Sequence, residues 1–148
     1  MYLHFDAMEP TFDLEETKAC TCLAARKEAR SLTRRFERAL RPHGLRATQF
    51  SILAALALRG PTRLGALAEM LGLERTTLTR GVALLERSGW VASASSPDAR
   101  ERTLLLTAAG RRCLDGAFPA WKRVQDDVLA EGVARVASSP AVGVQDTA

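Results

Sequence analysis

Hydroxyl and guanidinium side chains gather in one short segment near the middle of the chain. The segment contains Thr76, Thr77, Thr79 and Arg80, and it lacks the Glu and Lys residues that an ordinary solvated helix face carries. An arginine can donate two parallel hydrogen bonds to a guanine edge, and threonines can contact phosphates or thymine methyl groups. We therefore predict that this segment contacts bases or phosphates of DNA, together with Arg87 on the same helical face. The alternative is a solvated helix face that binds nothing.

A second basic group follows in a turn-rich stretch. The stretch contains two arginines, Arg100 and Arg102, and a carboxylate, Asp98, at every second position. Arginines at the tip of a hairpin can reach phosphates or the minor groove, and a carboxylate can orient a guanidinium through a charge-assisted pair. We predict a DNA-contacting wing, and the sequence leaves open which arginine enters the groove and which one Asp98 holds. The alternative is a charged turn that only keeps a hairpin soluble.

Two cysteines, Cys20 and Cys22, lie near the start of the first expected helix. They could be redox-active thiols or small buried hydrophobic residues, and we expect the second. The carboxylates of Asp13, Glu15 and Glu16 disfavour the thiolate that oxidants attack. The opposing effect of a helix N-terminus fades within the first turn, beyond which Cys20 lies if Asp13 is the N-cap. Residues two apart on a regular helix also point in different directions, which argues against a bond between the two sulfurs.

The first expected helix begins at Asp13, a favourable N-cap, and runs to Arg41, where Pro42 and Gly44 stop it. Such a helix is long for so small a protein. One end of it must therefore pack on a surface beyond this chain's own core. We expect that surface to belong to a partner subunit.

Three shorter helices are expected next. The second covers residues 49–59 after a Thr48 cap, the third begins at Thr62, and the fourth covers residues 75–88. Gly72 lies in the turn between the last two. A glycine in a turn between two short helices is typical of a helix-turn-helix.

The fourth expected helix has two distinct faces. Leu78, Val82 and Leu85 form one apolar stripe at 100° per residue. We expect this stripe to be buried, which would turn Thr76 and Arg80 outward on the opposite face.

A hairpin and a long helix complete the expected elements. Residues 90–94 and 103–107 read as two short strands that flank the turn-rich stretch. The helix opens at Thr107 and runs to about Ala130, and Pro119 inside it should bend it. We expect residues 139–148 to form a flexible tail.

Size and composition fit an ordinary globular protein. The chain has 148 residues, of which 47% are hydrophobic and 26% charged, so we expect residues 1–148 to form a single domain. The longest apolar run, residues 50–58 with the interruption of Ser51, is far shorter than the roughly 18 residues of a membrane span. With no signal sequence at the start, we expect a cytoplasmic and most simply a bacterial protein.

The cysteine and histidine residues give no sign of a metal site or an active site. An odd number of cysteines, three, with no Cys-x-x-Cys argues against a disulfide scaffold and a structural zinc site. No histidine is spaced to act as a base for a cysteine nucleophile. We expect no cofactor, no metal and no enzymatic activity.

Positive charge is concentrated in one part of the chain, although the net charge is only +4. Residues 17–46 carry nine basic residues against two acidic ones, whereas residues 1–16 carry five acidic residues and no basic one. A local basic excess is typical of a nucleic-acid binder, and its alternative is a solvated helix face.

The order of these elements resembles the MarR family of bacterial transcription regulators. The resemblance covers roughly residues 18–130. The pieces that carry it are Leu45-x-x-x-Gln49-Phe50, Leu64-x-x-Leu67-Ala68-x-x-Leu71-Gly72, Thr77-x-Thr79-Arg80, Leu85-Glu86-x-x-Gly89-x-Val91, Asp98-x-Arg100-x-Arg102 and Leu106-Thr107-x-x-Gly110.

The resemblance implies a mainly α fold with a small β-hairpin wing. A winged helix-turn-helix, residues 47–106, would bind DNA, and residues 12–46 and 107–138 would form a helical dimerisation lobe. The resemblance places Arg100 at the wing tip. It also implies a homodimer on a pseudo-palindromic operator of double-stranded DNA.

Some members of the MarR family bind small aromatic acids between the two lobes, and some sense peroxides with a cysteine of the first helix. By this resemblance Phe36, His43, Phe118 and Trp121 could line such a ligand site, although aromatics at helical spacing more often belong to a core. We predict a DNA-binding repressor released by a small ligand. The alternatives are a thiol-based redox-sensing regulator and a winged-helix module that binds protein.

Overall fold

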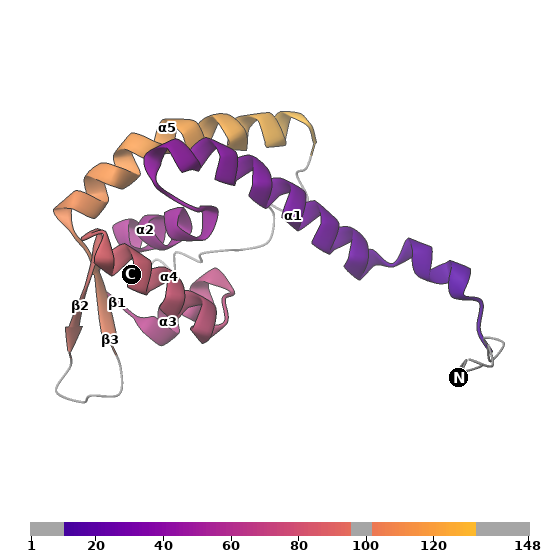
Figure 1. Ribbon diagram of the computed structural model, residues 1–148, viewed down its shortest axis with the longest axis horizontal. Coiled ribbons are helices and arrows are strands. Elements are labelled where there is room, and N and C mark those ends of the chain that lie inside the picture. The colour runs from indigo at the N-terminus through magenta and orange to yellow at the C-terminus, as the bar shows by residue number, and fades with distance from the viewer. Residues whose placement is uncertain (1–10, 96–101, 133–148) are drawn as a thin grey trace, which may run out of the picture. The chain divides into compact units, whose positions relative to one another are not determined.

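The computed structural model describes residues 11–95 and 102–132 (Figure 1). Asp98, Arg100 and the expected tail at 139–148 lie outside the described residues. The chain divides into two compact units, Met1–Thr33 and Arg34–Ala148, and the division falls within one helix. Each unit is described by itself.

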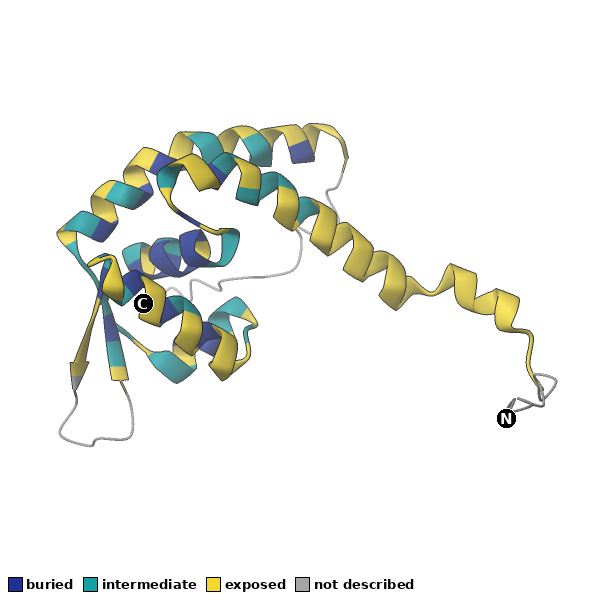
Figure 2. Ribbon diagram, viewed as in Figure 1, coloured by how far each residue is buried: buried dark blue, intermediate teal, exposed yellow. Residues whose placement is uncertain are grey.

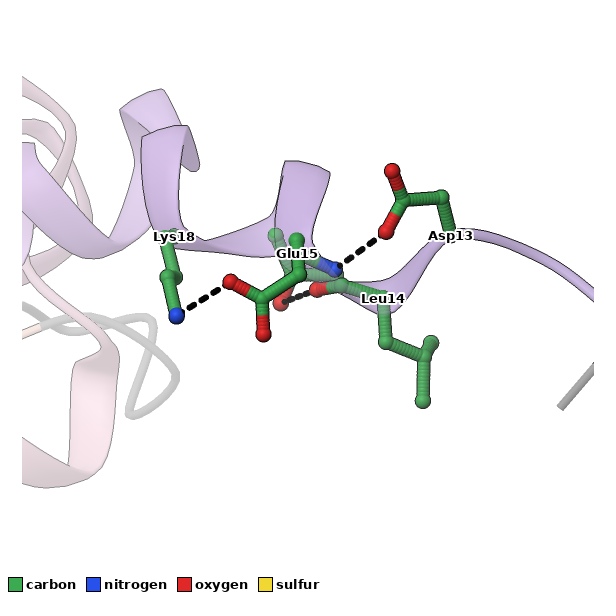
Figure 3. Close-up of polar contacts among 5 residues, drawn as sticks. Asp13, Leu14, Glu15 and Lys18 are labelled. Atoms are coloured by element: carbon green, nitrogen blue, oxygen red, sulfur yellow. Dashed lines mark hydrogen bonds and ion pairs between the residues drawn. The ribbon is translucent and has the colours of Figure 1, made fainter.

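The first unit contains a short 3-10 helix, η1, Leu14–Ala19, followed by the start of α1, Thr21–Leu40. The Asp13 carboxylate accepts a hydrogen bond from the Glu15 amide at 3.0 Å, which confirms Asp13 as a cap (Figure 3). Lys18 forms an ion pair with Glu15 in the same turn.

The prediction of one helix from Asp13 to Arg41 is wrong, because helical structure is interrupted at Cys20 between η1 and α1. Cys20 has an extended backbone, with φ −60° and ψ 111°. Thr17, Cys20 and Thr21 have low helix propensity, and the Thr17 hydroxyl donates to the Leu14 carbonyl at 2.7 Å, as side chains that compete with the backbone do. No burial offsets these local preferences.

Every residue from 11 to 31 is exposed, which Figure 2 shows as a continuous yellow stretch. Apolar side chains are among them, including Phe12, Leu14 and Leu23. Most helical stability in proteins comes from packing an apolar face, and this stretch buries no residue within the chain.

The second unit contains the remaining elements, which form the helices and a three-stranded sheet. After α1 they are η2 Arg41–His43, α2 Ala47–Arg59, β1 Thr62–Arg63, α3 Leu64–Leu71, α4 Arg75–Arg87, β2 Val91–Ser95, β3 Arg102–Leu106 and α5 Ala108–Ala130. The strands are antiparallel in the order β1-β3-β2.

Helix α2 lies at the centre of the core and contacts α3, α4, α5 and β3. Its Ile52, Leu53 and Leu56 are almost completely buried. The expected inward stripe of α4 is confirmed, since Leu78, Val82 and Leu85 are all fully buried in the same cluster. The core therefore joins both helices of the helix-turn-helix to α5 and the sheet.

The start of α2 differs from the prediction. Thr48 is not the cap, because the helix begins at Ala47 with Arg46 in the N-cap position. The free backbone donors are satisfied by other side chains: the Arg46 amide donates to Gln49 Oε1 at 2.9 Å and the Ala47 amide to Glu37 Oε1 at 3.1 Å. Glu37 belongs to α1, so a residue from another helix does part of what Thr48 was expected to do.

Thr62 does not begin a helix, as the sequence suggested, but a third strand. Thr62 pairs with Leu104 and Arg63 with Thr103, and α3 begins at Leu64. The β-branched Thr62 suits a strand, but its partner lies far along the chain, where a local pattern cannot show it.

The final part of α1 and the end of α5 are joined by an ion pair. Arg35 donates two hydrogen bonds to the Glu131 carboxylate, at 2.6 and 2.8 Å. These hydrogen bonds hold the pKa of Glu131 below its usual value. Almost three turns earlier in α5, Trp121 packs near Phe36, with ring centroids 6.3 Å apart.

Helix α5 opens at Thr107, as predicted, and Thr107 is its N-cap. Its hydroxyl accepts a hydrogen bond from the Gly110 amide at 3.0 Å and donates one to the Gly89 carbonyl at 2.6 Å. Helix α5 continues through Pro119 to Ala130. The cap brings Gly110 against Trp90, so closely that a Cβ on Gly110 would lie 2.1 Å from the Trp90 carbonyl oxygen.

This contact predicts opposite effects for two glycines of α5. Gly110→Ala should destabilise the fold by about 1–3 kcal/mol, because its methyl group would overlap backbone that cannot move away. Gly116→Ala is the matched control, since nothing lies within 4 Å of its Cβ position. It should stabilise the helix by about 0.5–1 kcal/mol. Urea unfolding of both variants checks this, and equal stabilities would contradict the packing described.

Candidate nucleic-acid interface

The buried stripe of α4 determines which of its side chains face outward. With Leu78, Val82 and Leu85 at 0% exposure, the opposite face cannot turn inward without burying charge. The structure accordingly leaves exposed all five residues of α4 that the sequence singled out: Thr76, Thr77, Thr79, Arg80 and Arg87.

The side chains on this face differ in how far they are engaged within the protein. The Thr79 hydroxyl donates to the Arg75 carbonyl at 2.7 Å, which leaves its oxygen lone pairs and methyl group for a ligand. Arg75 itself packs over Gly65 of α3, its Nη2 3.0 Å from where a Cβ would be. Within the described part of the chain, Arg80 and Arg87 make no hydrogen bond or ion pair. Their guanidinium groups can therefore bind an acceptor from outside.

In the described part of the wing, Arg102 makes its contacts within the protein. Arg102 opens β3 and pairs in register with Ser95 at the end of β2. Its guanidinium forms an ion pair with Glu86 of α4 and donates to Ser93 Oγ at 3.1 Å. Arg102 is thus joined to α4 and to the neighbouring strand β2. DNA contacts by Asp98 and Arg100 remain predictions.

A cavity of about 540 Å³ lies between α2 and α5 in the second unit. Its lining is mostly apolar and consists of Phe50, Ala54, Ala57, Leu58, Arg111, Leu114, Asp115, Phe118 and Trp121. The Trp121 ring stacks on Phe50, with centroids 5.5 Å apart and planes 15° apart, and lies 5.5 Å from the Phe118 ring. The structure therefore provides an aromatic wall.

Only two of the four predicted ligand-site residues line this cavity. Phe118 and Trp121 do, whereas Phe36 lies against Trp121 outside the lining, and His43 is also outside it. The sequence reasoning missed Phe50 and the charged pair of Arg111 and Asp115, which are joined at 3.0 Å. For Arg111 and Asp115 the sequence did offer a signal, because their i, i+4 spacing places them on the face of α5 that carries Phe118.

The cysteines of the first unit are not buried, so the expectation of buried hydrophobic residues is wrong. Cys20 and Cys22 are both exposed. Because α1 begins at Thr21, Cys22 lies in its first turn, and the Arg26 Nη2 atom is 3.3 Å from its sulfur. The carboxylate of Glu15 is paired with Lys18. In the second unit, burial raises the pKa of the half-buried Cys113.

Among the described residues, no group of three or more His, Cys, Asp or Glu side chains is placed to hold a metal ion. No helix among them is long and apolar enough to span a membrane.

Sequence and structure comparisons agree on the kind of protein. A profile of the MarR family matches residues 43–101. The structure resembles a DNA complex of the Mycobacterium tuberculosis transcriptional regulator MosR, with a TM-score of 0.73 and 42% identity over 80% of this chain and 88% of that one. A second MosR structure gives 38% identity, coverage of 82% and 90%, and the same TM-score. The uncharacterised HTH-type transcriptional regulator YwoH of Bacillus subtilis (strain 168) is 28% identical over 105 residues, or 71% of this chain and 77% of its own.

The helix-turn-helix, the three-stranded sheet and the outward arginine face together define a winged helix-turn-helix protein. The chain belongs to the MarR family of DNA-binding transcription regulators. The predicted family and fold class are confirmed. Membership also makes the chain a regulator rather than an enzyme, and it favours DNA over protein as the partner of the winged helix-turn-helix.

Proposed function

We propose that this regulator is a homodimeric repressor, which binds a pseudo-palindromic operator and is released by a small ligand. The observation that carries sequence-specific binding is the exposed face of α4, with two unengaged arginines and three threonines beside a fully buried stripe. Arg80 would donate to a guanine edge in the major groove, and the threonines would contact phosphates or thymine methyl groups. The complex of MosR with DNA supports DNA as the partner.

The exposed stretch at residues 11–31 supports the homodimer. It carries apolar side chains but buries none of its residues within the chain. A second copy with the same unmatched surface would cover it symmetrically. Two copies related by a two-fold axis would present two α4 helices to half-sites about 10 base pairs apart.

The cavity between α2 and α5 supports release by a ligand. Its volume suits a small organic molecule. The Phe50, Phe118 and Trp121 rings offer a stacking surface. Arg111 is paired with Asp115 through its Nε atom, and its remaining N–H groups can donate to the carboxylate of a ligand. A small aromatic acid matches this combination. Because α2 also packs on α4, a ligand that displaces α2 would shift the recognition helix.

A second candidate function, thiol-based redox sensing, is favoured by the surroundings of Cys22. Two of the reasons for expecting inert cysteines, burial and a position beyond the first helical turn, do not hold for Cys22. The Arg26 guanidinium beside the sulfur attracts negative charge that forms on it. Hydrogen peroxide would convert the thiolate to a sulfenic acid and release hydroxide. The extended backbone at Cys20 also removes the argument from a regular helix against a bond between the two sulfurs.

Substitution of Arg80 separates base reading from phosphate binding. Arg80→Ala should weaken operator binding by about 1–3 kcal/mol and relax the preference at one base pair per half-site. Fluorescence anisotropy on operator and on random DNA measures both effects. Arg112→Ala, an equal loss of charge at an exposed position of α5, is the control and should change neither. Equal losses on both DNAs would show that Arg80 only binds a phosphate.

A single release assay on three proteins separates the two modes of release. Wild type, Ala57→Trp, which fills the cavity, and a Cys20→Ser/Cys22→Ser variant are each bound to operator DNA. Benzoate should release wild type and the serine variant but not Ala57→Trp, because the indole occupies the ligand's space. Redox sensing predicts that peroxide releases wild type and Ala57→Trp, reversibly with a reducing thiol, but not the serine variant.

Each arm has an outcome that rules its candidate out. Release of Ala57→Trp by benzoate at the wild-type concentration would exclude the cavity as the ligand site. Equal sensitivity of wild type and the serine variant to peroxide would exclude the two cysteines. Cys113→Ser is the matched thiol control, since Cys113 is the half-buried cysteine.

A further inference from the structure

The wing is connected to the recognition helix through a single arginine. Arg102 lies at the start of β3, and its Nη2 atom contacts both the Glu86 carboxylate and the Ser93 hydroxyl. Glu86 lies in the last turn of α4, and Ser93 is in the middle of β2. One guanidinium therefore joins three elements: the recognition helix and both strands of the wing.

This arrangement does not suit Arg102 to bind DNA directly. The carboxylate of Glu86 neutralises its charge, and the same nitrogen is shared between two acceptors. Arg80 and Arg87 lie on the same helix as Glu86 without an intramolecular partner among the described residues. The contrast assigns the two kinds of arginine to different tasks.

We propose that Glu86 and Arg102 are positioning residues, which hold the β2–β3 wing at a fixed angle to α4. The inference rests on the proposed reading of DNA by α4. A duplex must meet the helix and the wing together, so a wing that is free to swing would have to be ordered during binding, at a loss of affinity. A partly exposed ion pair contributes little to the stability of the fold. Its effect should therefore appear in DNA binding rather than in unfolding.

Glu86→Gln distinguishes positioning from simple electrostatics by the sign of its effect. Removing an acidic group near a DNA-binding face should tighten binding to any DNA, because the repulsion of phosphates is lost. The positioning role predicts the reverse for operator DNA, a weakening of about two- to fivefold. Glu69→Gln removes an exposed acidic residue of α3 and is the control; it should leave operator affinity unchanged or raise it.

Exchanging the charges of Arg102 and Glu86 tests whether the two residues affect DNA binding through their contact with each other. Arg102→Glu alone should weaken operator binding strongly, since two carboxylates would then face each other. Adding Glu86→Arg restores an ion pair with reversed polarity and should recover most of the loss. A double variant that binds no better than Arg102→Glu would mean that Arg102 contacts DNA itself, and would overturn the proposal.

Amide hydrogen exchange in the absence of DNA tests the same connection independently of operator binding. Glu86→Gln should speed exchange in β2 and β3 while leaving the amides of α2 unchanged, because only the wing loses an anchor. Unchanged exchange in both strands would overturn the proposal, as would tighter operator binding by Glu86→Gln. A wild-type protein that binds operator and random DNA equally would refute the proposed function instead, and the exchange result would still decide the role of Glu86.

Discussion

The packing of α4 on α2 is the constraint on which the rest of this structure depends. Leu78, Val82 and Leu85 are fully buried against a helix whose own Ile52 and Leu56 are almost inaccessible. The two helices approach closely at Gly81, where an added Cβ would lie 3.1 Å from the Ile52 side chain. Rotation of α4 about its axis would bury Arg80 or expose this stripe, and both are unfavourable. The core thus determines which residues DNA can meet.

The same core connects DNA binding to places where a signal could act. Helix α2 contacts α4 on one side and α5 on another, and the cavity lies between α2 and α5. The sheet is fixed to this core by the fully buried Leu104 of β3. Through Arg102 and Glu86 the wing is attached to α4 as well. Because α2 packs directly on α4, a displacement of α2 would also move the face of α4 that we propose binds DNA.

The features that the sequence predicted correctly are local ones. The spacing of Leu78, Val82 and Leu85 defined the buried face of α4, and the start of α5 at Thr107 was visible from the residues that follow it. These features depend on helical periodicity and on neighbours within one turn. The outward direction of Arg80 follows from the same periodicity.

The features that the sequence did not predict depend on partners from elsewhere in the chain. Glu37 replaces Thr48 in satisfying the start of α2, and β3 turns Thr62 into a strand residue. Glu86 similarly gives Arg102 a partner within the protein. The break at Cys20 has a different origin. The cysteines there were expected to be buried, but residues 11–31 are all exposed, so no packing stabilises a continuous helix.

Selection of operator sequences from random duplex DNA by the purified protein tests the central claim most directly. Two copies that each insert α4 into a major groove should enrich a pseudo-palindrome, with half-site centres about 10 base pairs apart. Each half-site should contain a guanine whose enrichment is lost with Arg80→Ala. Enrichment of a single asymmetric site, or a palindrome whose sequence does not depend on Arg80, would contradict the account.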